Sequence, residues 1–238
     1  MTPRLYQDLA HLWPCLSPPE DYTAEAQIIH DLLTEHFGDR RLNLLELGAG
    51  GGHTLYHLKH HHNCTASDLS PEMLAQCQAL NPEVPTIVAD MRSAQLNQTF
   101  DAILIHDAID YLLSIDDINQ TLRTAHDHLR PNGLLLVAPT ETADTFEHAS
   151  ATDRHTTDTH DYALTSTLER PHTPHTFRLT LDITITDRAT QAAEHITDHH
   201  TCGLFPRSAW LEQLHDAGFV ATPRETQLTW TLFHAVRP

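Results

Sequence analysis

The sequence predicts an α/β protein built on a doubly wound parallel sheet. Apolar runs typical of buried strands alternate five times with helical patterns between residues 42 and 138. A turn with four glycines in five residues joins the first of these strands to the helix that follows. After Pro139 the pattern changes, and regular apolar–polar alternation over 177–185 predicts an antiparallel strand with one dry face.

The first forty residues predict helices that precede the sheet. Apolar and aromatic residues among prolines indicate a short helix before residue 20. Asp21 is expected to cap a longer helix that runs to about Phe37, because a short acidic side chain can accept from the first free N–H groups. Gly38 is expected to end that helix.

The core elements follow from the same spacing rules. Ser70 is expected to be an N-cap, because Pro71 follows at the first helical position and Glu72 places an acid in the first turn. The core strands are expected at residues 42–47, 65–68, 86–90, 101–105 and 134–138. The helices between them are expected at about 53–60, 70–81 and 115–129. A helix over 208–217 and a strand over 229–236 complete the set.

We expect a single domain over residues 1–238, because no repeat and no linker interrupts the chain. Four regions are expected within it: an N-terminal helical cap, a cofactor-binding core, an antiparallel insertion on the substrate side, and a C-terminal helix and strand. Their expected ranges are 1–40, 41–139, 140–205 and 206–238.

Composition excludes several classes of partner. The chain has 14 Lys and Arg against 32 Asp and Glu, a formal charge of −18, which argues against nucleic acid and anionic membranes. The 21 histidines would remove part of that charge near pH 6. Neither a membrane-length apolar run nor a signal-peptide core is evident, and the four cysteines are scattered. We therefore expect a cytoplasmic monomer or homodimer that acts on a small molecule.

The glycine-rich turn differs from the dinucleotide-binding fingerprint. Counting G-x-G-x-x-G from Gly48 requires glycine at position 53, which is His53. The chain instead has E-x-G-x-G-x-G, beginning at Glu46. A carboxylate just before the turn would repel a pyrophosphate, whereas it suits a ligand with a cationic end.

Three successive predicted strands end in acidic residues, 22 residues apart each time: Glu46, Asp68 and Asp90. In an open parallel sheet the carboxyl ends of the strands form the ligand crevice. Asp68 can accept from the two hydroxyls of a ribose, and Asp90 with Met91 suits an adenine. Glu46 could orient the turn and an ammonium group. A ligand with ribose, adenine, an ammonium and no phosphate is S-adenosylmethionine.

These motifs together resemble those of class I S-adenosylmethionine-dependent methyltransferases. The resemblance covers about residues 40–138, in motif order and spacing. It includes the glycine turn, Asp68-Leu69-Ser70-Pro71-Glu72-Met73-Leu74, Ala89-Asp90-Met91, Phe100-Asp101-Ala102-Ile103 and Leu129-Arg130-Pro131-Asn132-Gly133. It implies a Rossmann-like sheet of seven strands with the last strand antiparallel.

A narrower resemblance is to small-molecule N-methyltransferases of the amino-sugar and glycine type. The segments that carry it are 21–26, 90–92 and 198–205. It implies that Tyr22 contacts the cofactor and that the insertion covers the acceptor. The amino-sugar enzymes have a histidine after the fourth strand where this chain has Tyr111.

The candidate site residues fall into two groups. The expected cofactor contacts are Tyr22, Glu46, Gly48, Ala49, Gly50, Asp68, Leu69, Met73, Asp90, Met91 and His106. The expected catalytic residues are Tyr6, His106, Asp107, Tyr111 and His200. Of the adjacent pair His199 and His200, at most one is expected to reach the site, since neighbours on a strand face opposite ways.

Three functions remain open from the residues alone. The first is methyl transfer to a nitrogen of an amine or amino sugar, with a His or Asp accepting the proton. The second is O-methylation of a natural-product hydroxyl or carboxylate, and the third is a non-catalytic, cofactor-binding regulatory subunit. No metal is expected, because His60-His61-His62 has the character of a solvated helix end and zinc-type spacing does not occur.

Overall fold

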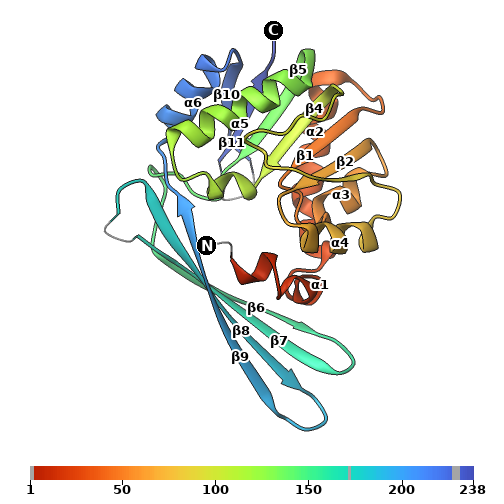
Figure 1. Cartoon of the computed structure of the whole chain (residues 1–238), viewed down its shortest axis with the longest axis vertical. Coiled ribbons are helices and arrows are strands. Elements are labelled where there is room, and N and C mark those ends of the chain that lie inside the picture. Colours follow the sequence, from red (N-terminus) through yellow and green to blue (C-terminus); the bar gives the residue numbers. More distant parts are fainter. Residues whose placement is uncertain (1–2, 171–172, 227–230) are drawn as a thin grey trace.

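The computed structural model describes residues 3–170, 173–226 and 231–238, which form two sheets joined by the central chain (Figure 1). The large sheet has seven strands in the order β10-β11-β5-β4-β1-β2-β3. Its strands are β1 (Asn43–Leu47), β2 (Asn63–Asp68), β3 (Thr86–Val88), β4 (Phe100–His106), β5 (Leu129–Ala138), β10 (Val220–Arg224) and β11 (Leu232–Val236). All neighbours pair in parallel except β11, which is antiparallel to both β5 and β10. This confirms the predicted fold.

Helices cover both faces of the large sheet. They are α2 (Thr23–Phe37), α3 (His53–Leu58), α4 (Pro71–Leu80), α5 (Ile115–His128) and α6 (Arg207–Asp216). Successive strand residues face opposite layers: Leu44 packs in the layer with α2, α3 and α4, while Leu45 packs in the layer with α5 and α6. Both residues are buried because the sheet is covered on each side.

The second sheet is antiparallel and has the order β6-β7-β8-β9. Its strands are β6 (Ala149–Thr156), β7 (His160–Glu169), β8 (Thr176–Asp187) and β9 (Ala193–Gly203). The alternation over 177–185 falls within β8, so this prediction is confirmed. The sheet extends well beyond the predicted strand, because β7 pairs with β8 and β6 pairs with β7 through backbone hydrogen bonds that composition did not reveal.

The N-terminal segment lies between the two sheets (Figure 1). It contains the short helices η1 (Arg4–Tyr6), η2 (Ala10–Leu12), α1 (Trp13–Leu16) and η3 (Pro19–Tyr22). Its leucines pack against the dry face of the antiparallel sheet, in a cluster that includes Leu5, Leu16, Leu181 and Ile183. This packing fixes the segment over the edge of the large sheet where the strands end.

The structure corrects two local predictions, for Asp21 and for the start of the fifth strand, and confirms two others, for Ser70 and Gly38. Asp21 does not cap α2, because it lies inside η3 and the N-cap position is Tyr22, without a side-chain cap bond. Ser70 is confirmed as the α4 N-cap, since its hydroxyl accepts from the Met73 N–H at 3.0 Å. Gly38 ends α2 with φ +75°. The fifth strand begins at Leu129 rather than Leu134, because α5 leads directly into β5.

Two further differences concern the C-terminal part. Strand β10 was not predicted, because Pro223 and its short length hide it in the sequence. The predicted final strand is β11, and its first two residues, Thr229 and Trp230, lie outside the described residues. In the described part of the chain, no helix has both the length and the apolar character needed to cross a membrane.

Candidate active site

A cavity of about 780 Å³ lies where the strands β1, β2 and β4 end, under the N-terminal segment. Its walls come from the glycine turn, the ends of β1 and β2, the segment after β3, the helix η4 (Ala108–Tyr111) and the N-terminal helices. Strand order reverses around β1, which lies between β2 and β4. This is the topological position at which open α/β sheets bind ligands.

The glycine turn begins at Gly48, which has φ +78°. A Cβ at this position would lie 2.2 Å from the Cβ of Ala108. Glycine is therefore required twice, once for the left-handed backbone and once for the close approach of η4. Gly48, Ala49 and Gly50 all line the cavity.

Asp68 ties the second strand to that turn. Its Oδ2 accepts from the Gly50 N–H at 2.8 Å, and its Oδ1 accepts from the Ser70 N–H at 2.8 Å. Burial raises the pKa of Asp68, and the two backbone N–H bonds oppose that increase. Each carboxylate oxygen keeps a lone pair, so this half-buried group can still accept from ligand hydroxyls in the cavity.

Glu46 lies at the floor of the cavity and is only 4% exposed. Its Oε2 atom has no hydrogen-bond partner among the described residues. Burial raises the pKa of Glu46 well above its usual range, and the nearby carboxylates of Glu25, Asp107 and Asp68 raise it further. An orphaned buried carboxyl among acids fits a cationic ligand group, as the sulfonium and ammonium of S-adenosylmethionine provide.

Asp90 and Met91 also line the cavity, but Asp90 already has a partner. Arg92 holds the Asp90 carboxylate in a two-pronged ion pair, with its shortest contact at 2.7 Å, and reaches Asp117 at 2.9 Å. The pKa of Asp90 is lowered, first by this side-chain bond to Arg92. The sequence did not predict this partner; Asp90 therefore has fewer lone pairs left for an adenine amine than expected.

His106 and Asp107 close the end of β4. The Nδ1 atom of buried His106 lies 3.2 Å from Glu25 Oε1 and 3.3 Å from Asp107 Oδ2. Burial raises the pKa of Glu25 to about 6, although His106 opposes this. Asp107 has φ +46° and accepts from the Thr140 hydroxyl. Both residues line the cavity, as do Leu69 and Met73.

A polar group of three predicted residues lies where the cavity meets the antiparallel sheet. Tyr111 donates from its hydroxyl to that of Tyr6 at 2.9 Å, and its oxygen lies 2.6 Å from Nδ1 of His200. Tyr6 and Tyr111 line the cavity, whereas His200 is 1% exposed and lies behind Tyr111. The exposed neighbour His199 lines the rim instead, so of this pair only one side chain is in the cavity wall.

Tyr22 lines the cavity and its hydroxyl lies 2.9 Å from that of Ser17. The sequence did not indicate three other residues that line the same cavity, namely Trp13, His53 and Thr54. The Trp13 and His53 rings stack with centroids 6.0 Å apart. The lining role of His53 and Trp13 depends on the tertiary structure, because their ring contact joins α3 to the N-terminal segment.

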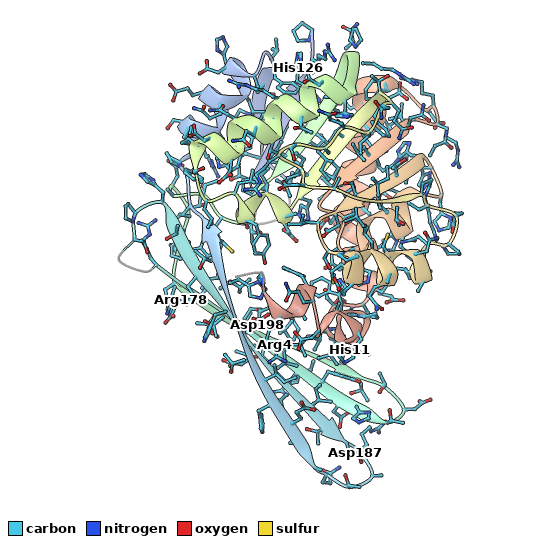
Figure 2. The ribbon with its side chains drawn as sticks, viewed as in Figure 1. Arg4, His11, His126, Arg178, Asp187 and Asp198 are labelled. Carbon is cyan, nitrogen blue, oxygen red and sulfur yellow. The ribbon has the colours of Figure 1, made fainter. Side chains whose placement is uncertain are left out.

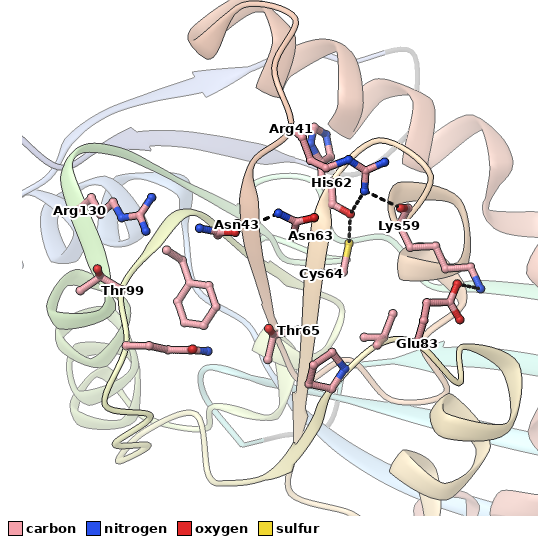
Figure 3. A pocket seen from close by; sticks show the side chains of 14 residues that line it. Arg41, Asn43, Lys59, His62, Asn63, Cys64, Thr65, Glu83, Thr99 and Arg130 are labelled. Carbon is pink, nitrogen blue, oxygen red and sulfur yellow. Dashed lines mark hydrogen bonds and ion pairs between the residues drawn. The ribbon is translucent and has the colours of Figure 1, made fainter.

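A second cavity, of about 530 Å³, lies at the opposite, amino-terminal edge of the strands (Figure 3). Its cations are engaged with protein groups: Lys59 pairs with Glu83 at 3.0 Å, and Arg130 pairs with Asp101 at 2.8 Å. Arg41 donates to backbone carbonyls at the end of α3, including that of His60 at 2.7 Å. These contacts hold the strand starts together, so we assign the cavity a structural role. Within the described ranges, no cluster of three or more His, Cys, Asp or Glu residues is arranged to hold a metal ion.

Comparison with known proteins agrees with this geometry. Residues 44–133, from β1 to the start of β5, match the family described as methyltransferase domain. The chain is 29% identical over 129 residues to dTDP-3-amino-3,4,6-trideoxy-α-D-glucopyranose N,N-dimethyltransferase of Streptomyces venezuelae. That alignment covers 53% of this chain and 54% of the relative, so the match spans about half of the relative's length.

Solved structures share the fold over nearly the whole chain. DesVI of Streptomyces venezuelae superposes with a TM-score of 0.84 at 24% identity, covering 97% of this chain and 96% of DesVI. The sugar N-methyltransferase KedS8 of Streptoalloteichus superposes with a TM-score of 0.83 at 25% identity, covering 97% and 92%. The family match thus covers residues 44–133, while the shared fold extends over nearly the whole chain.

Proposed function

We propose that this chain transfers a methyl group from S-adenosylmethionine to the amino nitrogen of a small amino sugar. The observation that carries the proposal is one cavity that is lined by the carboxyl residues Glu46 and Asp68 and also by Tyr6 and Tyr111. The printed functions of the relatives, N,N-dimethylation of nucleotide-linked 3-amino sugars, support the choice of acceptor. They favour nitrogen over a hydroxyl or carboxylate.

The chain's own residues would hold the cofactor by charge and hydrogen bonding. Asp68 would accept from the ribose hydroxyls, Glu46 would face the cationic end, and Met91 and Leu69 would contact the base. When bound, S-adenosylmethionine supplies a methyl group on a sulfonium, which needs no further activation. The protein's task is then to align the amine and exclude water, which can contribute up to about 7–11 kcal/mol.

The test is methyl transfer from S-adenosylmethionine carrying a labelled methyl group. The acceptors are dTDP-3-amino-3,6-dideoxy-α-D-glucopyranose, its 4-deoxy relative and the matching 3-hydroxy sugar, followed by mass spectrometry. We expect label on the amino nitrogen of one or both amino sugars and none on the hydroxyl analogue. Label only on hydroxyls would overturn the N-methyl assignment, and cofactor binding without any transfer would favour a regulatory subunit.

We further propose that the protein works in the cytoplasm, as a monomer or homodimer. All four cysteines are unbridged, which supports a reducing compartment. Light scattering of the purified chain measures the mass in solution, and fractionation of the producing cells measures the compartment. Recovery outside the cytoplasm, or a mass above two copies, would contradict these assignments.

A further inference from the structure

We propose that Asp198 and His200 form, with Tyr111 and Tyr6, a buried path that takes a proton from the acceptor amine. The inference rests on the proposed function, because it assigns a destination for a proton that N-methylation must remove. An amine attacks through its lone pair, so an ammonium has to lose a proton first. The four residues come from η1, η4 and β9, and only the tertiary structure brings them together.

The path has one continuous set of contacts from the cavity inward. The Tyr6 and Tyr111 hydroxyl oxygens are 2.9 Å apart, and the Tyr111 oxygen is 2.6 Å from His200 Nδ1. His200 Nε2 lies 3.2 Å from Asp198 Oδ2. The two inner residues are both buried, with His200 1% exposed and Asp198 6% exposed. Buried polar groups of this kind are retained where each has a partner.

Asp198 is held in place by the backbone. Its Oδ2 accepts from the Leu5 N–H at 2.8 Å, and its Oδ1 accepts from the His199 N–H at 3.1 Å. The first of these bonds joins η1 to β9, and the labelled Arg4 and Asp198 mark the junction (Figure 2). Arg4 itself pairs with Asp8 at 2.6 Å. Asp198 therefore acts as a positioning residue that orients His200 and stabilises its charged form.

Two proton arrangements connect the four residues, and they differ in the direction of the bond between the two hydroxyls, because each hydroxyl can turn and each can donate once. In the first, the bond between the hydroxyls is reversed from the direction given above, so that Tyr6 donates to Tyr111, Tyr111 donates to Nδ1, and Nε2–H donates to Asp198. In the second, Nδ1–H donates to Tyr111 and Tyr111 donates to Tyr6, while Nε2–H still donates to Asp198. The second arrangement has one more proton on His200, which is then an imidazolium.

One proton moves the path from the first arrangement to the second. The N–H bond of the ammonium breaks, its electron pair stays on nitrogen as the attacking lone pair, and the proton bonds to the Tyr6 oxygen. The Tyr6 proton passes to the Tyr111 oxygen, and the Tyr111 proton passes to His200 Nδ1. No charge is left on either phenol, which agrees with burial, since burial raises the pKa of both tyrosines. The proton returns to water by the reverse route once the product leaves.

The surroundings allow His200 to change charge. Burial lowers the pKa of His200, and Asp198 opposes that decrease. Burial also raises the pKa of Asp110, which precedes Tyr111 in η4, well above its usual range. Besides the four residues themselves, the titratable and charged groups whose charges act on the path are Arg4, Asp68, Asp107, Asp110, His199 and Cys202.

The test compares His200→Gln, Tyr111→Phe and Asp198→Asn with the wild type, using dTDP-3-amino-3,6-dideoxy-α-D-glucopyranose. The matched control is His195→Gln. His195 is an exposed histidine on the same strand, and its ring contacts the Thr184 hydroxyl in the same way that the ring of His199 contacts the Thr180 hydroxyl. We expect kcat to fall about 100-fold or more for His200→Gln and Tyr111→Phe, and about 10-fold for Asp198→Asn. The double variant Tyr111→Phe with His200→Gln should be no slower than either single variant, because both break the same path.

The pH profile separates this role from a structural one. The acidic limb of kcat should disappear in His200→Gln and move to lower pH in Asp198→Asn, while calorimetric affinity for S-adenosylhomocysteine changes less than twofold. An unchanged kcat and pH profile in both variants would overturn the path. If the wild type transfers no methyl to any amine, the proposed function fails instead. In that case an NMR titration of protein labelled with 15N-histidine tests the path independently of activity. The His200 ring must change protonation state, and it must do so at lower pH in Asp198→Asn than in the wild type.

Discussion

The Gly50 N–H donates to Oδ2 of Asp68 at 2.8 Å, which joins the glycine turn after β1 to the end of β2. One carboxylate thus both holds the turn and faces the cavity. Asp68→Asn keeps the shape but loses the charge, so we expect affinity for S-adenosylhomocysteine to fall about 10- to 100-fold, as loss of a charge-assisted hydrogen bond predicts. Calorimetry measures this. Asp153→Asn, on exposed β6, is the control, and equal affinities in the two variants would refute the role of Asp68.

Replacing Glu46 should raise the stability of the ligand-free protein and weaken its binding of the cofactor. The pKa of Glu46 is raised in the folded protein, so the ionised carboxylate costs stability once the pH rises above the ordinary carboxyl value, and the cost grows until the raised pKa is reached. Glu46→Gln removes that cost. We expect a higher Tm at pH 7 without ligand, about 2–4 °C for each kcal/mol gained, but weaker binding of S-adenosylmethionine. Scanning calorimetry and titration test both, and a lower Tm with unchanged affinity would reject this role.

Gly48→Ala should lower the free energy of unfolding by more than the strain of its positive φ angle alone would. Gly38 has a similar φ, +75°, but a Cβ there meets nothing within 4 Å, whereas at Gly48 it would meet Ala108. We expect Gly38→Ala to cost about 1–2 kcal/mol of unfolding free energy and Gly48→Ala about 1–3 kcal/mol more. Urea unfolding measures both. Equal losses of unfolding free energy in the two variants would mean that η4 moves away from the added methyl group without an energetic cost.

His62 should make the protein sensitive to acid. Burial lowers the pKa of His62 to about 4, so the folded state keeps it neutral, while the unfolded state binds a proton near pH 6.5. Its stabilising effect is complete above about pH 6.5 and is lost as the pH falls towards 4. We expect His62→Gln to flatten the fall of Tm across this window, and His60→Gln, an exposed neighbour, to leave it unchanged. Identical slopes in all three proteins would count against this assignment.

Local patterns in the sequence were enough to predict the large sheet and the start of α4. Strand and helix periods are local, and Ser70, Pro71 and the glycines act through their own backbone, so the core elements and the α4 cap could be predicted within a few residues. Asp68 and Glu46 could be placed together because parallel strands bring their carboxyl ends to one edge. Tyr6, Tyr111 and His200 could each be named as catalytic candidates, but their contacts with one another could not be predicted.

Only the tertiary structure decided which side chains meet. The contact of His200 with Tyr111 spans 89 residues, and that of Leu5 with Asp198 spans 193, distances over which periodicity has no information. The Asp90 carboxylate, which the sequence analysis assigned to a ligand, forms an ion pair with Arg92. Asp21 lies inside η3 and does not cap α2. Sequence patterns record what each segment buries, whereas partners across the chain depend on how the N-terminal segment packs between the two sheets.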